Sequence, residues 1–250
     1  MKIRLVGKNL EDIRPQLAAC GFVEAADGET AELIVTHGGD GALLGAERDF
    51  PGVPKLPLRD ARTAELCPRH KAELQLAAFR RNETTLSELP MVFARVGERQ
   101  LYALNDVFLH NSDRGSALRY RVRIDGVPYA EEVVGDGVGL ASVHGSTAYY
   151  RSITHSLFRV GIGLAFSNST EEVNHLVLAE TSRVEIEIVR GPGILIADNS
   201  PEQWTIAEGE RVIFGQSSRR ARIYGVANFM CPQCRLLRHS NKLPFKGLPF

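Results

Sequence analysis

The sequence predicts an α/β portion followed by a β-rich portion. The first sign is the stretch 31–44, where AELIVT is typical of a buried strand and leads through the glycine-rich HGGDG into an apolar segment with helical potential. A strand, a glycine-rich turn and a helix form the repeating unit of α/β sheets. The second sign is a series of short, β-rich, turn-bounded runs after about residue 90, which predicts an all-β second half. With 250 residues, the chain is long enough for one large domain or two small ones.

Strand and helix signals alternate through the first sixty residues. Lys2–Val6 alternates like a short strand. Asn9 is placed to cap a helix that runs to about Cys20 and stops at Gly21. The segment 51–58 contains three prolines, so it is expected to be extended or looped.

The remaining elements are predicted from periodicity and turn residues. Helical spacing covers 64–81, although Cys67-Pro68 predicts an interruption near its start. One further helix signal, Ser146–Phe158, directly follows a glycine. The β-rich runs of the second half are 91–96, 100–109, 118–125, 127–142, 184–189, 193–198, 211–216 and 221–229.

Composition argues against several classes of partner. Thirty basic and thirty acidic residues leave no overall field to recruit nucleic acid or anionic lipid. Only six of the basic residues are lysines, so a phosphate site is expected to use backbone amides, helix N-termini or arginines. No apolar run approaches the roughly 20 residues of a membrane span, and the opening MKIRLVGKNLED is not a signal peptide. Four cysteines do not suggest a disulfide framework, and the cytoplasm is the predicted location.

The motif GGDG (38–41) follows the predicted strand 31–36. Glycines at the end of a strand let a phosphate chain approach backbone amides. Asp40 would repel a bare phosphate, so it is expected to act as a metal ligand or as a base for an attacking hydroxyl. The alternative is a turn in which Asp40 accepts hydrogen bonds from neighbouring amides.

Two further motifs lie in the β-rich half. Asn105-Asp106 is either an ordinary turn or a pair that binds a base edge and ribose hydroxyls. GDG (135–137) is followed by GSTAY (145–149), which combines a glycine, two hydroxyls and an aromatic face. The alternative for GSTAY is an N-capped helix with Ser146 or Thr147 as the cap and Tyr149 in the core. That alternative does not explain the GDG upstream.

Together these motifs resemble the NAD kinase family, in which GGDG, an Asn-Glu/Asp pair and GDG followed by GSTAY occur in the same order. The resemblance extends from about residue 31 to the closing Leu236-Leu237-Arg238 and Lys242-Leu243. GGDG is shared with lipid kinases, whereas GDG plus GSTAY is close to diagnostic. The chain departs from the family pattern at Ala42, in Ser142-Val143-His144, in 151–154 and in PKLPLRDART (54–63).

The resemblance implies a Rossmann-like domain at 1–92, a β-sandwich domain at 93–229 and a tail, 230–250, that returns to the first domain. It implies a homodimer or homotetramer that phosphorylates the 2′-hydroxyl of the adenosine ribose of NAD. The donor would be ATP or another phosphoryl donor, with Mg²⁺ bound to it. Carried over by position, Asp40 would be the catalytic residue and Gly41 would lie near the phosphates.

The same resemblance assigns nucleotide-binding roles in the second half. Asn105 and Asp106 would hold the adenosine and a ribose, and Asp136 would reach a nicotinamide nucleoside across a subunit interface. The segment that offers hydroxyls and frames the adenine pocket would be Ser146, Thr147, Ala148 and Tyr149. Two alternatives are a non-catalytic nucleotide sensor of the same fold and, ranked last, a lipid-type kinase.

Two smaller features favour structural roles. Cys231-Pro-Gln-Cys234 has the spacing of a zinc knuckle, but a structural zinc site needs four ligands. Cys20 and Cys67 are far away in the sequence and His239 is the only nearby imidazole, so no metal site is predicted. His37 and His144 flank two of the motifs; either could contact phosphate, but a structural role is the commoner fate of such residues.

Overall fold

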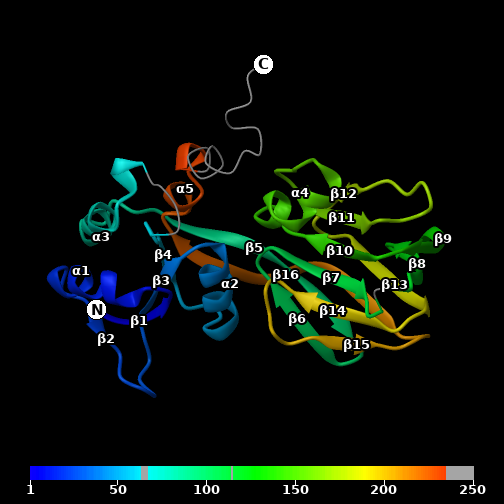
Figure 1. The fold of residues 1–250 in the computed structure, drawn as a ribbon, viewed down its shortest axis with the longest axis horizontal. Coiled ribbons are helices and arrows are strands. Elements are labelled where there is room, and N and C mark those ends of the chain that lie inside the picture. The colour runs from blue at the N-terminus through cyan, green and yellow to red at the C-terminus, as the bar shows by residue number, and fades with distance from the viewer. Residues whose placement is uncertain (63–66, 114, 235–250) are drawn as a thin grey trace. The chain divides into compact units, whose positions relative to one another are not determined.

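The computed structural model describes residues 1–62, 67–113 and 115–234, which fall into two compact units (Figure 1). The N-terminal unit comprises 1–88 and 221–250, and the β-rich unit comprises 89–220. The sequence-based boundaries lay at 92/93 and 229/230, and the exact boundaries stay a prediction. Most of the predicted returning tail, 235–250, lies outside the described residues, including the closing Leu-Arg and Lys-Leu motifs.

The N-terminal unit contains a parallel sheet in the order β2-β1-β3-β4. Its strands are β1 Lys2–Gly7, β2 Val23–Glu24, β3 Leu33–Gly38 and β4 Lys55–Arg59. The end of a long strand, β16, pairs in parallel with β4 at Ile223 and Lys55. The helices of this unit are η1 Leu10–Asp12, α1 Arg14–Ala19, α2 Asp40–Asp49, η2 Pro68–His70, α3 Ala72–Arg80 and α5 Val226–Phe229.

Every residue of β3 is buried, as expected for a parallel strand covered on both faces. The core of this unit joins apolar side chains of the sheet to those of α1 and α3, among them Leu17, Leu76 and Phe79. Lys55 and Glu47 form a buried ion pair that ties β4 to α2. The strand–turn–helix unit predicted around GGDG is therefore confirmed.

The helix predicted from Asn9 to Cys20 is broken into a 3₁₀ turn and the short α1. Asn9 has a left-handed backbone with φ 49°, and its side chain makes no capping hydrogen bond. The side-chain amide of Asn9 donates instead to Asp60 Oδ2 at 2.8 Å. The buried carboxylate of Asp60, which follows β4, thus takes the place of the helix backbone as partner of Asn9. Gly21, with φ 74°, follows the helix as predicted.

The β-rich unit consists of two antiparallel sheets. One has the order β16-β13-β8-β9, with β5 paired to both β16 and β6; the other has the order β12-β11-β10-β7-β14-β15. The strands of the first sheet are β5 Leu86–Val96, β6 Arg99–Ala103, β8 Leu118–Ile124, β9 Val127–Gly135, β13 Arg183–Arg190 and β16 Arg211–Tyr224. Those of the second are β7 Asp106–Asn111, β10 Gly137–Ala141, β11 Ile162–Ser167, β12 Leu176–Leu178, β14 Gly193–Ala197 and β15 Trp204–Ile206. β5 and β16 extend across the boundary between the units.

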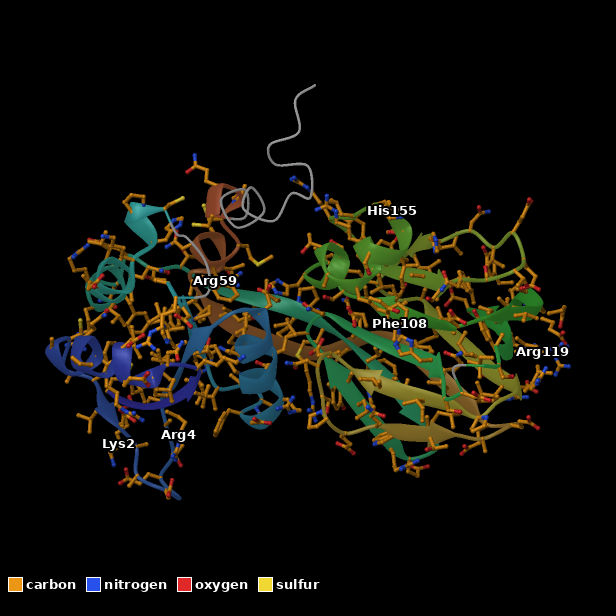
Figure 2. All side chains as sticks on the ribbon, viewed as in Figure 1. Lys2, Arg4, Arg59, Phe108, Arg119 and His155 are labelled. Carbon is orange, nitrogen blue, oxygen red and sulfur yellow. The ribbon has the colours of Figure 1, made fainter. Side chains whose placement is uncertain are left out.

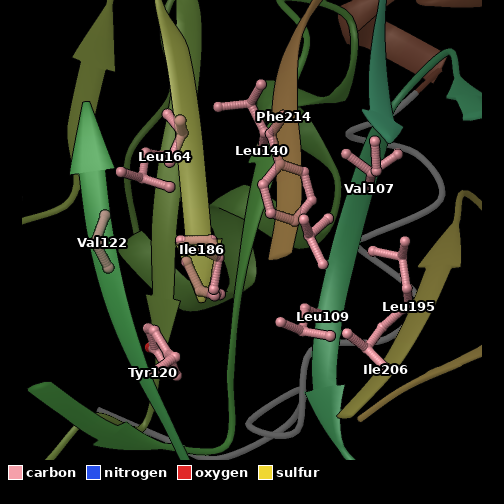
Figure 3. Close-up of a cluster of buried hydrophobic side chains, with 14 of the residues drawn as sticks. Val107, Leu109, Tyr120, Val122, Leu140, Leu164, Ile186, Leu195, Ile206 and Phe214 are labelled. Atoms are coloured by element: carbon pink, nitrogen blue, oxygen red, sulfur yellow. The ribbon is translucent and has the colours of Figure 1, made fainter. Parts of the chain in front are cut away.

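Side chains from both sheets form one continuous apolar core (Figure 3). Val107 and Leu109 of β7 face this core and meet residues such as Ile186 and Phe214 of the other sheet. Two packed sheets with alternating inward residues define a β-sandwich. The predicted fold class, a Rossmann-like α/β domain with a β-sandwich domain, is confirmed.

The second face of the six-stranded sheet is covered by the connection between β10 and β11. This connection contains η3 Gly145–Thr147 and α4 Tyr149–Thr154, and α4 lies beside β11 (Figure 1). The predicted helix, Ser146–Phe158, is therefore shorter than its periodicity suggested. A small cluster that includes Phe108, Tyr150 and Phe158 packs there. Among the described residues, no helix combines the length and apolar composition that a membrane crossing requires.

Candidate functional site

The GGDG motif forms the turn between β3 and α2. Gly38 has φ 148°, a conformation that favours glycine, and Gly39 precedes the first residue of the helix. Asp40 begins α2, at the carboxyl edge of the parallel sheet. Its side chain is 58% exposed. The structure thus presents this carboxylate to solvent at the edge where open α/β sheets bind ligands.

Arg59, the last residue of β4 and labelled in Figure 2, binds that carboxylate. Its Nη2 donates to Asp40 Oδ1 at 3.0 Å, and only 8% of its side chain is exposed. The same guanidinium donates twice to the carbonyl oxygen of Phe229 and lies 3.7 Å from the centre of that ring. A buried arginine fixed at several points restricts the position of the one carboxylate oxygen that it contacts.

A pocket of about 460 Å³ opens beside this turn, within the N-terminal unit. Its lining includes Arg59, Asp60 and Arg62 from the end of β4, and Lys71 next to α3. The three basic side chains of this lining are balanced by Asp12, Asp60 and Glu73. His37 also lines the pocket, and its Nδ1 lies 2.7 Å from the carbonyl oxygen of Lys8.

In the β-rich unit, Asn105-Asp106 lies at the start of β7. The carboxylate of Asp198 accepts the backbone amides of Leu104 at 2.8 Å, Asn105 at 2.7 Å and Asp106 at 3.2 Å. Asp198 has a left-handed backbone with φ 50° in the turn after β14. A carboxylate that binds three successive amides fixes the backbone of the motif.

Asp106 itself is buried, with only 8% of the residue exposed. Burial raises the pKa of its carboxyl to about 7, and the negative charge of Asp198 adds to the shift. Near neutral pH this group is therefore divided between an acid that donates a hydrogen bond and a carboxylate that accepts one.

The structure brings GSTAY against Asn105. A Cβ on Gly145 would lie 2.0 Å from the carbonyl oxygen of Asn105, so only glycine allows this approach. Ser142 reinforces the contact, because its hydroxyl donates to the Leu104 carbonyl at 2.5 Å and accepts the Gly145 amide at 3.1 Å. Ser146 is buried, and its hydroxyl donates to the Phe158 carbonyl at 3.0 Å.

These contacts contradict the N-capped-helix alternative for GSTAY. The residue that caps α4 is Ala148, which makes no side-chain capping bond. Tyr149 is 39% exposed, whereas the next residue, Tyr150, is 2% exposed and belongs to the core. Tyr149 is therefore a surface aromatic residue. Thr147 and Ala148 are partly exposed beside it.

Tyr149 is the exposed member of a small aromatic group whose other rings are Phe108, which is buried, and His110. Its ring meets Phe108 edge to face at 4.7 Å between centroids and lies 5.7 Å from His110, while Phe108 and His110 stack at 5.5 Å. Phe108 and His110 alternate with the core residues of β7, so they share the face that Asp106 also occupies. Burial lowers the pKa of His110, and the charge of Asp136 acts in the opposite direction.

Asp136 lies between β9 and β10, close enough to His110 for its charge to act on that ring. Its Oδ2 accepts the Asn168 side-chain amide at 2.8 Å. Tyr149 and Asn168 both line a pocket of about 470 Å³, together with residues of α4 and the segment after β11. The β-rich unit thus places Asn105 and Asp106 at the start of β7, with GSTAY beside Asn105, and Asp136 at the far end of the same strand. Asp40 and Gly41 belong to the other unit.

Three residues of these two regions were missed by sequence reasoning. Arg59 was hidden in the proline-containing segment 51–58 and the loop that follows, although arginine rather than lysine was expected at an anion site. His110 could have been found from the alternation of polar and apolar residues along 106–110. Asp198 belongs to an Asp-Asn-Ser turn, and nothing in the sequence links that turn to residues 104–106.

One expectation about metal ligands is wrong. Cys67 was placed far from Cys231-Pro-Gln-Cys234 on sequence distance alone. In the structure Cys67, His70, Cys231 and Cys234 each offer a ligand atom, and these atoms all lie within 4.8 Å of one another. The fold brings the segment after β4 beside the segment after α5. His239 lies outside the described residues.

Comparison with solved structures defines the class of fold. A yeast NADH kinase in complex with NADH matches 90% of this chain and 83% of its own, with a TM-score of 0.76 and 16% identity. An NAD kinase from Archaeoglobus fulgidus in complex with ATP matches 94% of this chain and 99% of its own, with a TM-score of 0.75 and 17% identity. The chain therefore has the fold of these nucleotide kinases.

Sequence comparison finds relatives that are all named NAD kinase. The NAD kinase of Bordetella avium is 34% identical over 144 residues, which are 54% of this chain and 48% of that protein. The chain spans about half the length of the curated relatives that it matches at this level. No protein-family model matches the chain. These comparisons confirm the resemblance to the NAD kinase family.

Proposed function

We propose that the chain is an NAD kinase, which transfers a phosphoryl group to the 2′-hydroxyl of the adenosine ribose of NAD and yields NADP. The observation that carries this proposal is the exposed Asp40 carboxylate, anchored by the buried Arg59 at the start of α2. A fixed carboxylate at a glycine turn suits a general base that takes the proton of an attacking hydroxyl. The names of the relatives and of both solved structures support the same reaction.

Phosphoryl transfer needs mainly positioning and neutralisation of charge. In this proposal Asp40 removes the ribose proton while glycine-rich backbone lets the phosphates of the donor approach. Tyr149, the exposed residue of the aromatic group, offers a ring face for the adenine, and Asp106 lies on the same side of β7 to bond ribose hydroxyls. The donor is ATP or another phosphoryl donor.

Mg²⁺ is proposed as the companion of the donor. Mg²⁺ commonly binds one or two carboxylates, several waters and substrate phosphates. The residues fit this mode, because the exposed carboxylate of Asp40 lies at the glycine turn. Among the described residues, no cluster of acidic side chains that could enclose a metal ion lies at this turn. When bound, the ion would neutralise charge on the phosphates.

The direct test is an assay of the purified full chain with NAD, Mg²⁺ and a panel of phosphoryl donors. Formation of NADP, read by an NADP-specific dehydrogenase, is the expected result. Asp49→Asn at the opposite end of α2 serves as a control variant with the same change of charge. Tight NAD binding with no NADP formed from any donor would instead favour the sensor, for which no observation speaks at present.

The homo-oligomer and the cytoplasmic location remain predictions. A variant of Asp136 can test the homo-oligomer. We expect this residue to serve the site of a neighbouring subunit, as the family resemblance implies. Inactive Asp40→Asn and Asp136→Ala variants should then partly rescue one another when mixed, because some sites combine both intact carboxylates. Subunit exchange without recovered NADP formation would assign Asp136 to its own chain or remove it from the mechanism.

A further inference from the structure

The N-terminal unit contains a compact group of three cysteines and one histidine. Cys67 directly precedes the short η2 helix, His70 is its last residue, and Cys231 and Cys234 follow α5. All four residues are buried, with between 2% and 7% of each exposed. Each residue offers one ligand atom, and these four atoms lie within 4.8 Å of one another. None of the three cysteines forms a disulfide.

The two arms of this group are built alike. One reads Cys-Pro-Arg-His and the other Cys-Pro-Gln-Cys, so each arm places two ligands three residues apart, with a proline directly after the first. Pairs with this spacing, one from each of two separate segments, are the usual arrangement in structural zinc sites. Four ligands drawn from Cys and His complete a tetrahedral set without an open position, which is the mark of a structural rather than a catalytic site.

Buried cysteines can also serve simply as small apolar residues. The polar contacts here favour ligation. His70 Nδ1 lies 3.1 Å from Cys234 Sγ, and the amide of Cys67 donates to the same sulfur at 3.3 Å. Nitrogen atoms directed at a sulfur suit a thiolate better than an apolar thiol. In a tetrahedral zinc site the ligand atoms lie about 3.5–3.8 Å apart, so shifts of roughly an ångström suffice.

We propose that Cys67, His70, Cys231 and Cys234 bind one Zn²⁺ ion as a structural site. The thiols lose their protons on binding, and Zn²⁺ takes three thiolates and one neutral imidazole nitrogen. The ion joins a segment near residue 70 to the segment that follows α5, across more than 160 residues of sequence. It thereby replaces part of the core that these two short arms cannot form by themselves.

The zinc site also bears on the proposed catalytic turn. α5 ends at Phe229, whose carbonyl oxygen and ring hold Arg59, and Arg59 holds Asp40. Two residues beyond Phe229 the chain reaches Cys231. Fixing Cys231 and Cys234 therefore fixes the end of α5 and the anchor of Arg59. The binding of zinc does not depend on the proposed kinase activity, whereas this second consequence rests on it.

The test uses the full chain, purified under reducing conditions, with Zn²⁺ alone as the probe. We expect one Zn²⁺ per chain by elemental analysis, and release of that zinc when a thiol-blocking mercurial is added. In a separate sample from which the metal is removed with a chelator under reducing conditions, Co²⁺ should give thiolate charge-transfer absorption and the intense visible bands of a tetrahedral complex. Removal of the metal should lower the thermal unfolding midpoint, and Zn²⁺ should restore it.

Variants locate the site. Cys234→Ser and His70→Ala should lose stoichiometric Zn²⁺, while Cys20→Ser, which changes a cysteine outside the group, should keep it. If Cys234→Ser does not fold, His70→Cys provides a second route, because four thiolates should retain the metal with a changed Co²⁺ spectrum. Three results would overturn the proposal: reduced wild-type protein that binds neither ion, equal loss of metal in Cys20→Ser, or a mass that reveals a disulfide between these cysteines.

Discussion

Asp40 and Asp106 are both acidic residues of turn motifs, yet the two regions place them in opposite environments. Asp40 is 58% exposed by side chain and has a buried arginine at 3.0 Å. Asp106 is buried, and its charged neighbour is another carboxylate, Asp198. A fixed and accessible carboxylate suits proton abstraction, whereas a buried one beside a like charge tends to keep its proton.

A sequence motif alone therefore does not define the function of its carboxylate. At the start of α2, the glycines expose Asp40, and the chemistry is proposed to occur there. At the start of β7, Gly145 and Asp198 fix the backbone around Asn105. The accessible side chain of this region is that of Tyr149. The first region is expected to control turnover and the second to control binding.

The largest expected effect is that of Asp40→Asn. Loss of a general base costs about 10²–10⁴ in rate, while dinucleotide binding should stay within a few-fold because the amide keeps the shape of the carboxylate. Steady-state rates of NADP formation and calorimetric NAD binding measure the two effects. Near-normal turnover in this variant would remove Asp40 from the mechanism.

A second prediction concerns the pH dependence of stability and the buried Asp106. Its pKa is raised to about 7 in the folded chain, against about 3.9 in an unfolded one. The folded state therefore keeps the proton of Asp106 to higher pH than the unfolded state. The contribution of this proton to the free energy of unfolding is complete below about pH 4 and is lost as pH rises to about 7. The loss amounts to about 1.4 kcal/mol for each pH unit between the two pKa values.

Asp106→Asn removes this dependence. Unfolding midpoints in urea from pH 4.5 to 8 should fall less steeply for the variant than for the wild type, and the variant should be the more stable protein at pH 8. Parallel pH profiles for the two proteins would mean that Asp106 titrates normally, and the contrast with Asp40 would lose its electrostatic basis.

A matched pair of glycine substitutions separates tight packing from helix propensity. In Gly145→Ala the new Cβ would overlap the backbone of Asn105, so the substitution should destabilise the chain by about 1–3 kcal/mol. Gly45→Ala lies within α2, where the Cβ meets only an arginine side chain at 3.5 Å, and should stabilise it by about 0.5–1 kcal/mol. Denaturant unfolding of both variants decides whether GSTAY is locked against Asn105.

The last substitution concerns the binding role of Tyr149. Loss of a stacking face in Tyr149→Ala should weaken NAD binding by about 1–3 kcal/mol, and Tyr149→Phe should be mild. Because Tyr149 is 39% exposed, its loss should leave the unfolding midpoint nearly unchanged. If Tyr149→Ala unfolds the protein, Tyr149 is a core residue, which is the alternative that the sequence left open.

The parts of this molecule that sequence reasoning predicted are those with local causes. The order of strand, glycine turn and helix around Asp40 follows from residues next to one another, and so does the change to β-rich runs after residue 90. Where a distant partner competes, the local signal failed. Asn9 has the side chain of a helix cap, yet it donates to Asp60, because a buried carboxylate needs that hydrogen bond.

The missed residues share one physical cause. Asp198 binds amides that lie over ninety residues earlier, and Cys67 meets Cys234 across 167 residues. Such pairs become neighbours only when sheet order and register are known, and a single sequence does not define them. Tyr149 and Tyr150 are adjacent and chemically identical, and only the direction of α4 exposes one and buries the other.

Side-by-side measurement of kcat and of the dissociation constant for NAD in Asp40→Asn and Tyr149→Ala separates the chemistry of the α2 turn from binding at Tyr149. The division between the two regions predicts opposite patterns. Asp40→Asn should lose turnover by about 10²–10⁴ and keep its affinity, and Tyr149→Ala should lose affinity by about 1–3 kcal/mol with a much smaller loss of turnover. Equal losses of both quantities in both variants, or the reverse pattern, would contradict the assignment of chemistry to the turn at α2.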